Sequence, residues 1–182
     1  MRLMIVAAVA VAATAGLPPV AASAAPSSVS RESVQTAGTS VEQSAACTKP
    51  CNRKITDDYP YKKRIGKVDP YNFWAGQCTS FAAWRINDRL KLKFHNNYKG
   101  VNWGDAKTWD DAAKKVRLKV DRTPKVGNIA VWNDGRFGHV AYVARVDGSK
   151  IVVEEYNKSK REAYSERTIS RNDPDNYIHF PF

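Results

Sequence analysis

Cysteine and histidine are scarce in this 182-residue chain, which has three of each. Cys47 and Cys51 have no histidine nearby, which makes them a poor metal site, and their spacing is not the Cys-x-x-Cys of a redox motif. The apolar run from Leu3 to Ala15 has 13 residues, whereas a helix that spans a bilayer needs about 20. The chain also contains no internal repeat. These features argue against a dithiol redox enzyme, a membrane-embedded protein and a repeat architecture.

Acidic residues are also in short supply. The chain has 29 Lys and Arg against 18 Asp and Glu, a formal net charge of +11. Residues 53–182 hold 26 of the basic and 16 of the acidic residues, so the excess does not belong to a tail. A basic folded domain attracts polyanions through long-range steering and counterion release. Anionic wall polymers, extracellular nucleic acid and acidic lipid surfaces are candidate partners, and plain solubility is the alternative reason for the charge.

The first 24 residues have the pattern of a secretory signal. A positive start at Met1-Arg2 precedes the apolar run, and Ala22-Ser23-Ala24 supplies the small residues of a cleavage site. We expect cleavage after Ala24 without lipid attachment, because no cysteine lies near the cut. An uncleaved N-terminal anchor is the alternative. Secretion would place the protein in an oxidising compartment, outside the cell or at its wall.

Residues 25–52 are rich in Ser, Ala, Thr and Val and contain no aromatic residue. Such a segment cannot bury enough apolar surface to offset the entropy lost on ordering, so we predict a flexible linker. Cys47 and Cys51 at its end could form a local disulfide if the turn brings their Cα atoms within about 7 Å. Cys78 is then unpaired, and an unpaired cysteine in a secreted protein is either buried and inert or reactive.

The remaining residues, 53–182, are predicted to form one α+β domain. The pattern becomes helical from Cys78, with apolar residues at i, i+4 and i+8 (Ala82, Ile86 and Leu90). Residues 109–116 predict a second helix. After a turn at 123–127 the period changes to two, which predicts strands at 128–132, 139–146 and 151–157 and a short one near 177–180. Helices followed by an antiparallel meander indicate an α+β fold with the helices packed on the sheet.

A cysteine nucleophile needs help to ionise, because a free thiol has a pKa of about 8.5 and only a few per cent is thiolate at neutral pH. Cys78 lies in the first turn of the predicted helix, at the positive end of the helix dipole. An adjacent histidine would be the second aid. His95 lies in a polar stretch and His179 near the C-terminus, whereas His139 follows Gly138 and opens an apolar strand. We therefore predict Cys78 as nucleophile and His139 as base, with an ordinary strand histidine as the alternative.

A carboxylate beside His139 would hold its tautomer and stabilise the imidazolium. Glu154 and Glu155 follow on the next predicted strand and point to opposite faces. A three-residue loop at 146–148 would place Glu155 opposite His139, whereas a two-residue loop at 148–149 would place Glu154 on that face. The spacing alone leaves both open.

These residue types suit acyl transfer. The Cys78 thiolate would attack an amide carbonyl, and His139 would protonate the departing amine and then activate water. Backbone N–H groups at the helix start would hold the oxyanion, with the side chain of Gln77 as a further donor. For Gln77, a simple polar cap residue is the alternative.

Four blocks of residues carry a family resemblance. In order, they are Gly76 to Arg85, Pro124 to Trp132, Gly138 to Val143 and Val153 to Asn157. With these blocks, the chain from about Asp57 to Phe182 resembles the CHAP family, the cysteine- and histidine-dependent amidohydrolases and peptidases. The resemblance implies a papain-like fold and hydrolysis of amide bonds in peptidoglycan. It places the nucleophile at Cys78 and the base at His139.

The family's Glu-x-Asn pattern falls on Glu155 and Asn157, so the resemblance adds both to the implied catalytic set. It selects Glu155 over Glu154 and implies the loop of odd length. Some members bind calcium through carboxylates just before the cysteine. Here Tyr71 stands two residues after Asp69, so we expect no metal and no cofactor.

The resemblance therefore implies a secreted, monomeric peptidoglycan hydrolase, either an N-acetylmuramoyl-L-alanine amidase or a cross-bridge endopeptidase. We expect no membrane anchor and no specific nucleic-acid partner, and the basic charge could add weak retention on anionic wall polymers. The main alternative is a non-catalytic secreted module that binds the wall or a polyanion through its charge and through Trp74, Trp84 and Trp103. A cysteine peptidase that acts on proteins is a third hypothesis.

Overall fold

The computed structural model describes residues 55–182, and the fold is that of this part of the chain. The predicted signal at 1–24, the linker at 25–52 with its Cys47–Cys51 pair, and residues 53–54 of the predicted domain lie outside the described residues. The elements, in chain order, are α1 (Cys78–Leu90), η1 (Tyr98–Gly100), η2 (Ala106–Thr108), α2 (Trp109–Lys115), β1 (Lys119–Asp121), β2 (Ile129–Trp132), β3 (His139–Asp147), β4 (Lys150–Tyr156), β5 (Tyr164–Ser170) and β6 (Asn176–His179). In this described range, no helix is both long enough and apolar enough to cross a membrane.

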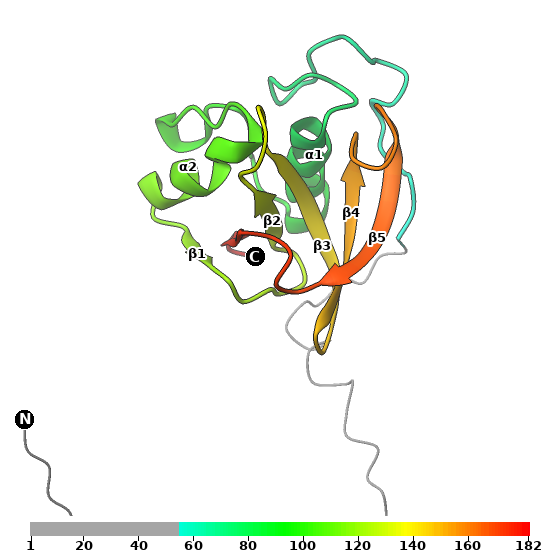
Figure 1. The fold of residues 1–182 in the computed structure, drawn as a ribbon. Helices are drawn as coiled ribbons and strands as arrows, with labels where there is room; N and C mark the ends of the chain where they lie inside the picture. The colour runs from blue at the N-terminus through cyan, green and yellow to red at the C-terminus, as the bar shows by residue number, and fades with distance from the viewer. Residues whose placement is uncertain (1–54) are drawn as a thin grey trace, which may run out of the picture. The chain divides into compact units, whose positions relative to one another are not determined.

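The strands form one antiparallel sheet in the order β1-β6-β2-β3-β4-β5. Strands β2 to β4 make the predicted meander and β5 extends it, while β6 returns from the C-terminal end to lie between β1 and β2. Helix α1 packs against β3 and β4, and α2 packs against β1 and β6. Figure 1 shows α1 behind the centre of the sheet and α2 beside β1. This is the α+β arrangement expected from the sequence.

Alternation along the strands gives the sheet two buried faces. The face toward the helices shares the main core with α1 and α2 and includes Ile129, Val131, Val140 and Tyr142. The opposite face carries a smaller cluster that includes Ala130, Trp132, Ala141, Val143 and Val153. His139 pairs with Trp132 and has the period of Ala141, so its side chain belongs to this second face.

Both helices and four of the strands agree with the pattern found in the sequence, but β1 and β5 were missed. Strand β1 has only three residues, too few to show a period. Strand β5 alternates between half-buried and exposed positions along its length. It lies at the sheet edge and contains Ser, Glu, Arg and Thr, so its apolar pattern is weak.

The β3–β4 hairpin corrects the predicted loop. Asp147 pairs with Lys150, so the loop has two residues and not an odd number. The pairing then shifts by one residue between Val143 and Arg145, which makes Ala144 the extra residue of a β-bulge. A one-residue shift exchanges the two faces of a strand. The bulge therefore places Glu155 on the face of His139, although the loop alone would have placed Glu154 there.

Glu154 instead points toward the helices, into a buried ion cluster. Its carboxylate accepts hydrogen bonds from Arg85, from Arg89 Nη1 at 2.5 Å and from the Tyr164 hydroxyl at 3.1 Å. The side chains of Glu154, Arg85 and Arg89 are all fully buried. Removing one partner from such a cluster leaves an uncompensated buried charge. The cluster thus ties α1 to β4 and β5, and it keeps Glu154 away from His139.

Candidate active site

A tight turn presents Cys78 at the N-terminus of α1. Gly76 has a φ of +85°, which glycine adopts without steric cost, and Gln77 at the N-cap position is extended. Cys78 is the first residue of the helix and its side chain is half-buried. The first N–H groups of a helix have no intrahelical partner and lie at the positive end of the dipole. The turn therefore places Cys78 at the positive end of the dipole of α1.

Gly138, a position where only glycine fits, precedes His139 and sets where β3 begins. Gly138 has a φ of +70°, and a Cβ there would lie 2.5 Å from the backbone N of Lys107 and 2.6 Å from the backbone O of Trp132. The two backbone segments can approach this closely only without a side chain at this position. His139 follows as the first residue of β3 and is 4% exposed. The sequence prediction that His139 opens a strand after Gly138 is confirmed.

The structure brings Cys78, His139 and Glu155 together from α1, β3 and β4. The Nε2 of His139 lies 2.9 Å from Oε2 of Glu155. Cys78 also interacts with the ring, because its hydrogen bond and its charge act to raise the pKa of His139. Because Nε2 is held by the carboxylate, Nδ1 is the ring nitrogen that remains for the thiol. This is the order nucleophile, base and orienting acid found in catalytic triads.

The electrostatics favour a charged pair. Burial acts to lower the pKa of His139, but its hydrogen bonds and charge interactions with Cys78 and Glu155 leave that pKa above the ordinary value of 6.5. Burial acts to raise the pKa of Glu155, but hydrogen bonds from His139 and Arg167 bring it below the ordinary value of 4.5. Both shifts stabilise an imidazolium beside a carboxylate.

Strand β5 contributes two residues that the sequence analysis missed. Ser165 Oγ donates to Glu155 Oε1 at 3.0 Å, and Arg167 donates to both Glu155 oxygens, from Nε at 2.6 Å and from Nη2 at 3.0 Å. The guanidinium of Arg167 also lies over the ring of Trp132. Ser165 and Arg167 are two positions apart, so they share one face of β5. The apolar residues Tyr164 and Ile169 fall on opposite faces of β5, so no period of two in the sequence marked this strand.

Asn157 lies in the site, where its side chain hydrogen-bonds Gln77, the residue before Cys78. Its Nδ2 donates to Gln77 Oε1 at 2.6 Å, and its Oδ1 accepts from the backbone N–H of Glu162 at 2.9 Å. Gln77 makes no side-chain capping hydrogen bond to α1, so it is not a simple polar cap. Because Asn157 holds the amide oxygen, the amide NH2 of Gln77 is left as the donor beside Cys78.

The carboxylate of Asp69, the residue considered for calcium in the sequence analysis, already has hydrogen-bond partners. Its Oδ1 accepts from the backbone N–H of Tyr71 at 2.8 Å and of Phe73 at 2.9 Å, and its Oδ2 accepts from the Ser80 hydroxyl. Burial raises the pKa of Asp69 although these hydrogen bonds act to lower it. Nowhere in residues 55–182 do three side chains of the metal-ligating types form a group that could hold an ion. The donor set does not fit a calcium ion.

The same network supports the turn before the nucleophile. The hydroxyl of Ser80 also hydrogen-bonds the hydroxyl of Tyr59, which accepts from the backbone N–H of Gly76 at 3.3 Å. Tyr59 and Ser80 are both fully buried. A buried chain of hydrogen bonds thus fixes Gly76, two residues before Cys78.

The tryptophans of the alternative binding hypothesis are mostly in the interior. Trp103 is fully buried and Trp84 is 7% exposed, whereas Trp74 is 59% exposed. Trp84 and Trp103 pack in aromatic clusters of the core, so neither can contribute to the binding surface of the alternative hypothesis. Trp74, four residues before Cys78, is the one of the three that a ligand can reach.

A model of the CHAP domain matches residues 66–157, just over half of the chain. The chain belongs to the CHAP family. The matched range contains Gln77, Cys78, His139, Glu155 and Asn157, the five residues that the structure gathers at the sheet end.

Two curated CHAP relatives illustrate the similarity. The probable autolysin LDP of Staphylococcus aureus (strain NCTC 8325 / PS 47) is 38% identical over 105 residues, which are 57% of this chain and 36% of that protein. The staphylococcal secretory antigen SsaA of the same strain is 35% identical over 107 residues, which are 58% of this chain and 38% of that protein. The match thus spans a little over a third of the length of these relatives.

A solved structure agrees with the fold. The crystal structure of N-acetylmuramoyl-L-alanine amidase from Staphylococcus aureus aligns with 63% of this chain and 33% of its own chain, with a TM-score of 0.51 and 27% sequence identity. The CHAP chain therefore has the papain-like α+β fold, with the nucleophile candidate at a helix start and the histidine on the sheet.

Proposed function

We propose that this CHAP protein is a secreted cysteine-dependent peptidoglycan hydrolase that cleaves an amide bond of the bacterial cell wall. The observation that carries the proposal is the buried His139–Glu155 pair, 2.9 Å between Nε2 and Oε2, whose imidazole pKa is also raised by Cys78 at the start of α1. A binding module has no need for a nucleophile, a base and an orienting carboxylate together. The names autolysin and N-acetylmuramoyl-L-alanine amidase, given to two similar proteins, support the choice of substrate.

Acylation would begin at the thiolate–imidazolium pair. Sγ of Cys78 attacks the amide carbonyl carbon, and the carbonyl oxygen becomes an oxyanion. In this proposal, the backbone N–H of Cys78 and the amide NH2 of Gln77 hold this charge. His139 then gives its proton to the departing amine, so the C–N bond breaks and a thioester remains on Cys78.

Deacylation returns the site to its starting state. Neutral His139 takes a proton from water, and the hydroxide formed attacks the thioester. Collapse of the second oxyanion releases the carboxylic acid product and restores the Cys78 thiolate beside the imidazolium. Glu155 stays ionised throughout, because Arg167 and Ser165 also hold its oxygens.

Three residues act through others in this scheme. Asn157 orients Gln77, Arg167 keeps the charge of Glu155, and Ser165 fixes the same carboxylate. The bond between the muramic acid lactyl group and L-alanine is the first candidate, given the name of the solved neighbour, and a cross-bridge amide is the second. We further propose secretion through residues 1–24, a linker at 25–52, a catalytic domain at 53–182 and action as a monomer outside the cell or at its wall.

The test uses the purified protein on isolated peptidoglycan sacculi, beside Cys78→Ser and His139→Gln. Soluble fragments are identified by mass spectrometry and new amino groups are labelled. Release by the unaltered protein alone is the expected result, and the fragment masses then name the bond. His95→Gln is the matched control, because His95 lies outside the site and should be dispensable. No release by any protein, with tight sacculus binding by all, would refute the enzyme and favour the binding module.

A further inference from the structure

Two exposed loops near the site are dense in positive charge. Between them, loops 61–68 and 158–162 carry seven basic residues, Lys62, Lys63, Arg64, Lys67, Lys158, Lys160 and Arg161, all of them exposed. Lys62 forms an ion pair with Asp57 at 3.4 Å. The other six, which we call the basic rim, have no carboxylate of residues 55–182 within ion-pair distance. Their charges therefore face solvent.

The rim holds most of the net charge of the described part of the chain. Residues 55–182 contain 24 Lys and Arg against 16 Asp and Glu, a net charge of +8. The two loops contain seven basic residues and one acid, Glu162, a net charge of +6. The other 115 described residues therefore carry only +2. Plain solubility would not need this concentration in one place.

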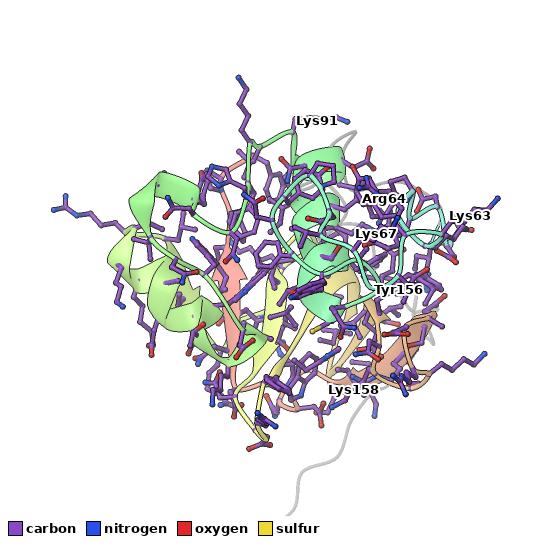
Figure 2. All side chains as sticks on the ribbon, turned by 90° about the horizontal axis from the view of Figure 1, so that it is seen from above. Lys63, Arg64, Lys67, Lys91, Tyr156 and Lys158 are labelled. Atoms are coloured by element: carbon purple, nitrogen blue, oxygen red, sulfur yellow. The ribbon has the colours of Figure 1, made fainter. Side chains whose placement is uncertain are left out.

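The loops converge beside the nucleophile. A Cβ on Gly76, two residues before Cys78, would overlap Cδ1 of Ile65 from the first loop and lie 3.5 Å from Cβ of Glu162 in the second. Figure 2, which looks down on this end of the molecule, shows Lys63, Arg64 and Lys67 to one side of Tyr156 and Lys158 to the other. The rim therefore borders the place where a substrate strand must lie to reach Cys78.

The position of the rim beside Cys78 favours a flexible polyanion over a flat anionic membrane. A flat anionic membrane seated on the rim would cover the approach to Cys78. A flexible chain of phosphodiesters that is attached to the substrate can run along the rim while the peptide amide enters the site. Exposed Lys and Arg contacts to phosphate are individually weak, but they add along a repeating polyanion, with a steep dependence on salt.

We propose that the basic rim selects peptidoglycan strands that carry a wall-linked polyphosphodiester, and so directs the hydrolase to polymer-bearing regions of the wall. The inference rests on the proposed function for its substrate, but binding tests it without catalysis. The binding proteins all carry Cys78→Ser, so that the wall is not degraded. The ligands are walls purified with their phosphate polymer and the same walls after the polymer has been stripped with hydrofluoric acid.

The rim variant replaces Lys63, Arg64, Lys67 and Lys158 with glutamine. The matched control replaces Lys93, Lys115, Lys125 and Lys150 with glutamine. These lysines are also exposed, and their replacement removes the same total charge. Each bound phosphate is worth about threefold in affinity at an exposed site, so we expect the rim variant to bind polymer-bearing walls at least tenfold more weakly. Its slope of log affinity against log salt should be shallower by about one for each phosphate that the variant no longer binds. Stripped walls should bind the rim variant and the unaltered protein alike.

Several results would overturn the proposal. Equal weakening with the rim and control variants would show a general charge effect, and equal weakening on both kinds of wall would show that the rim binds peptidoglycan itself. Free DNA that competes as well as soluble wall polymer at equal phosphate would remove the wall polymer as the selected partner.

With active protein, the rate on polymer-bearing walls should fall in the rim variant while the rate on a soluble muropeptide stays unchanged. No hydrolysis of either substrate, with wall discrimination intact, would refute the proposed function and leave the rim in place.

Discussion

Glu155→Gln removes one negative charge from a buried pair and keeps the shape of the side chain. Glu155 is fully buried and lies 2.9 Å from His139, and together with Cys78 it raises the pKa of the imidazole. An opposite charge this close shifts a pKa by about 1–3 units. We therefore expect the pKa of His139 to fall in the variant. Less imidazolium is then present at pH 7, and kcat/KM should fall by about 100-fold or more, since a positioned acid–base group contributes about 100- to 10,000-fold.

The same change alters stability in a defined pH window. The raised pKa of His139 contributes stability that is complete below its unfolded value of 6.5 and is lost as pH rises through the folded pKa. The lowered pKa of Glu155 contributes stability that is complete above its unfolded value of 4.5 and is lost as pH falls through the folded pKa. Glu155→Gln removes the contribution of Glu155 and reduces that of His139, so its loss of unfolding free energy should be largest between about pH 4.5 and 6.5.

Two measurements check this reasoning. An NMR titration follows the imidazole of His139, assigned by comparison with His139→Gln, and chemical denaturation at several pH values follows stability. Glu166→Gln is the matched control, because it removes the same charge from an exposed position on β5. A pKa of His139 that stays the same or rises in Glu155→Gln would refute the assigned coupling, as would an equal effect of Glu166→Gln.

Two further predictions concern the supports of the site. Gly138→Ala should lower the free energy of unfolding by about 2–5 kcal/mol, because it combines a left-handed φ with overlap against the backbones of Lys107 and Trp132. Gly135→Ala is the control, because Gly135 has a φ of +73° but open space around its Cβ, and it should lower the free energy of unfolding by only about 1–2 kcal/mol. Denaturant titrations measure both values, and equal losses would contradict the close approach of the Lys107 and Trp132 backbones to Gly138. Hydrolysis should be insensitive to chelators, because the oxygens of Asp69 are satisfied by Ser80 and by backbone N–H groups; loss of sacculus hydrolysis on chelation, reversed by calcium, would contradict that assignment.

Much of the fold could be predicted because its signals are local. The stripe of Ala82, Ile86 and Leu90 is on the buried side of α1, and the change of period after residue 127 marks the start of the meander. Strand β5 was not predicted, because an edge strand buries little side-chain surface and therefore needs few apolar residues. With β5 missing, Ser165 and Arg167 could not be placed beside Glu155.

The candidate site could be predicted only in part, because its contacts are not local. With only three histidines in the chain, His139 could be singled out as the partner of Cys78, which lies 61 positions away in the sequence. The choice of Glu155 came from the family pattern, and the loop length inferred with it was wrong. A bulge at Ala144 changes the register inside the strand, where no turn residue marks it. The hydrogen bond from Asn157 to Gln77 likewise depends on how two loops meet in space.

The adjacent glutamates of β4 make the two faces of the hairpin alike in charge. Glu155 belongs with His139, and Glu154 belongs with Arg85 and Arg89 on the other face. If β4 paired one residue out of step, the two carboxylates would exchange faces, so each face would still receive one. Charge alone therefore does not distinguish the two registers, and the bulge at Ala144 is the feature that sets which glutamate serves the histidine.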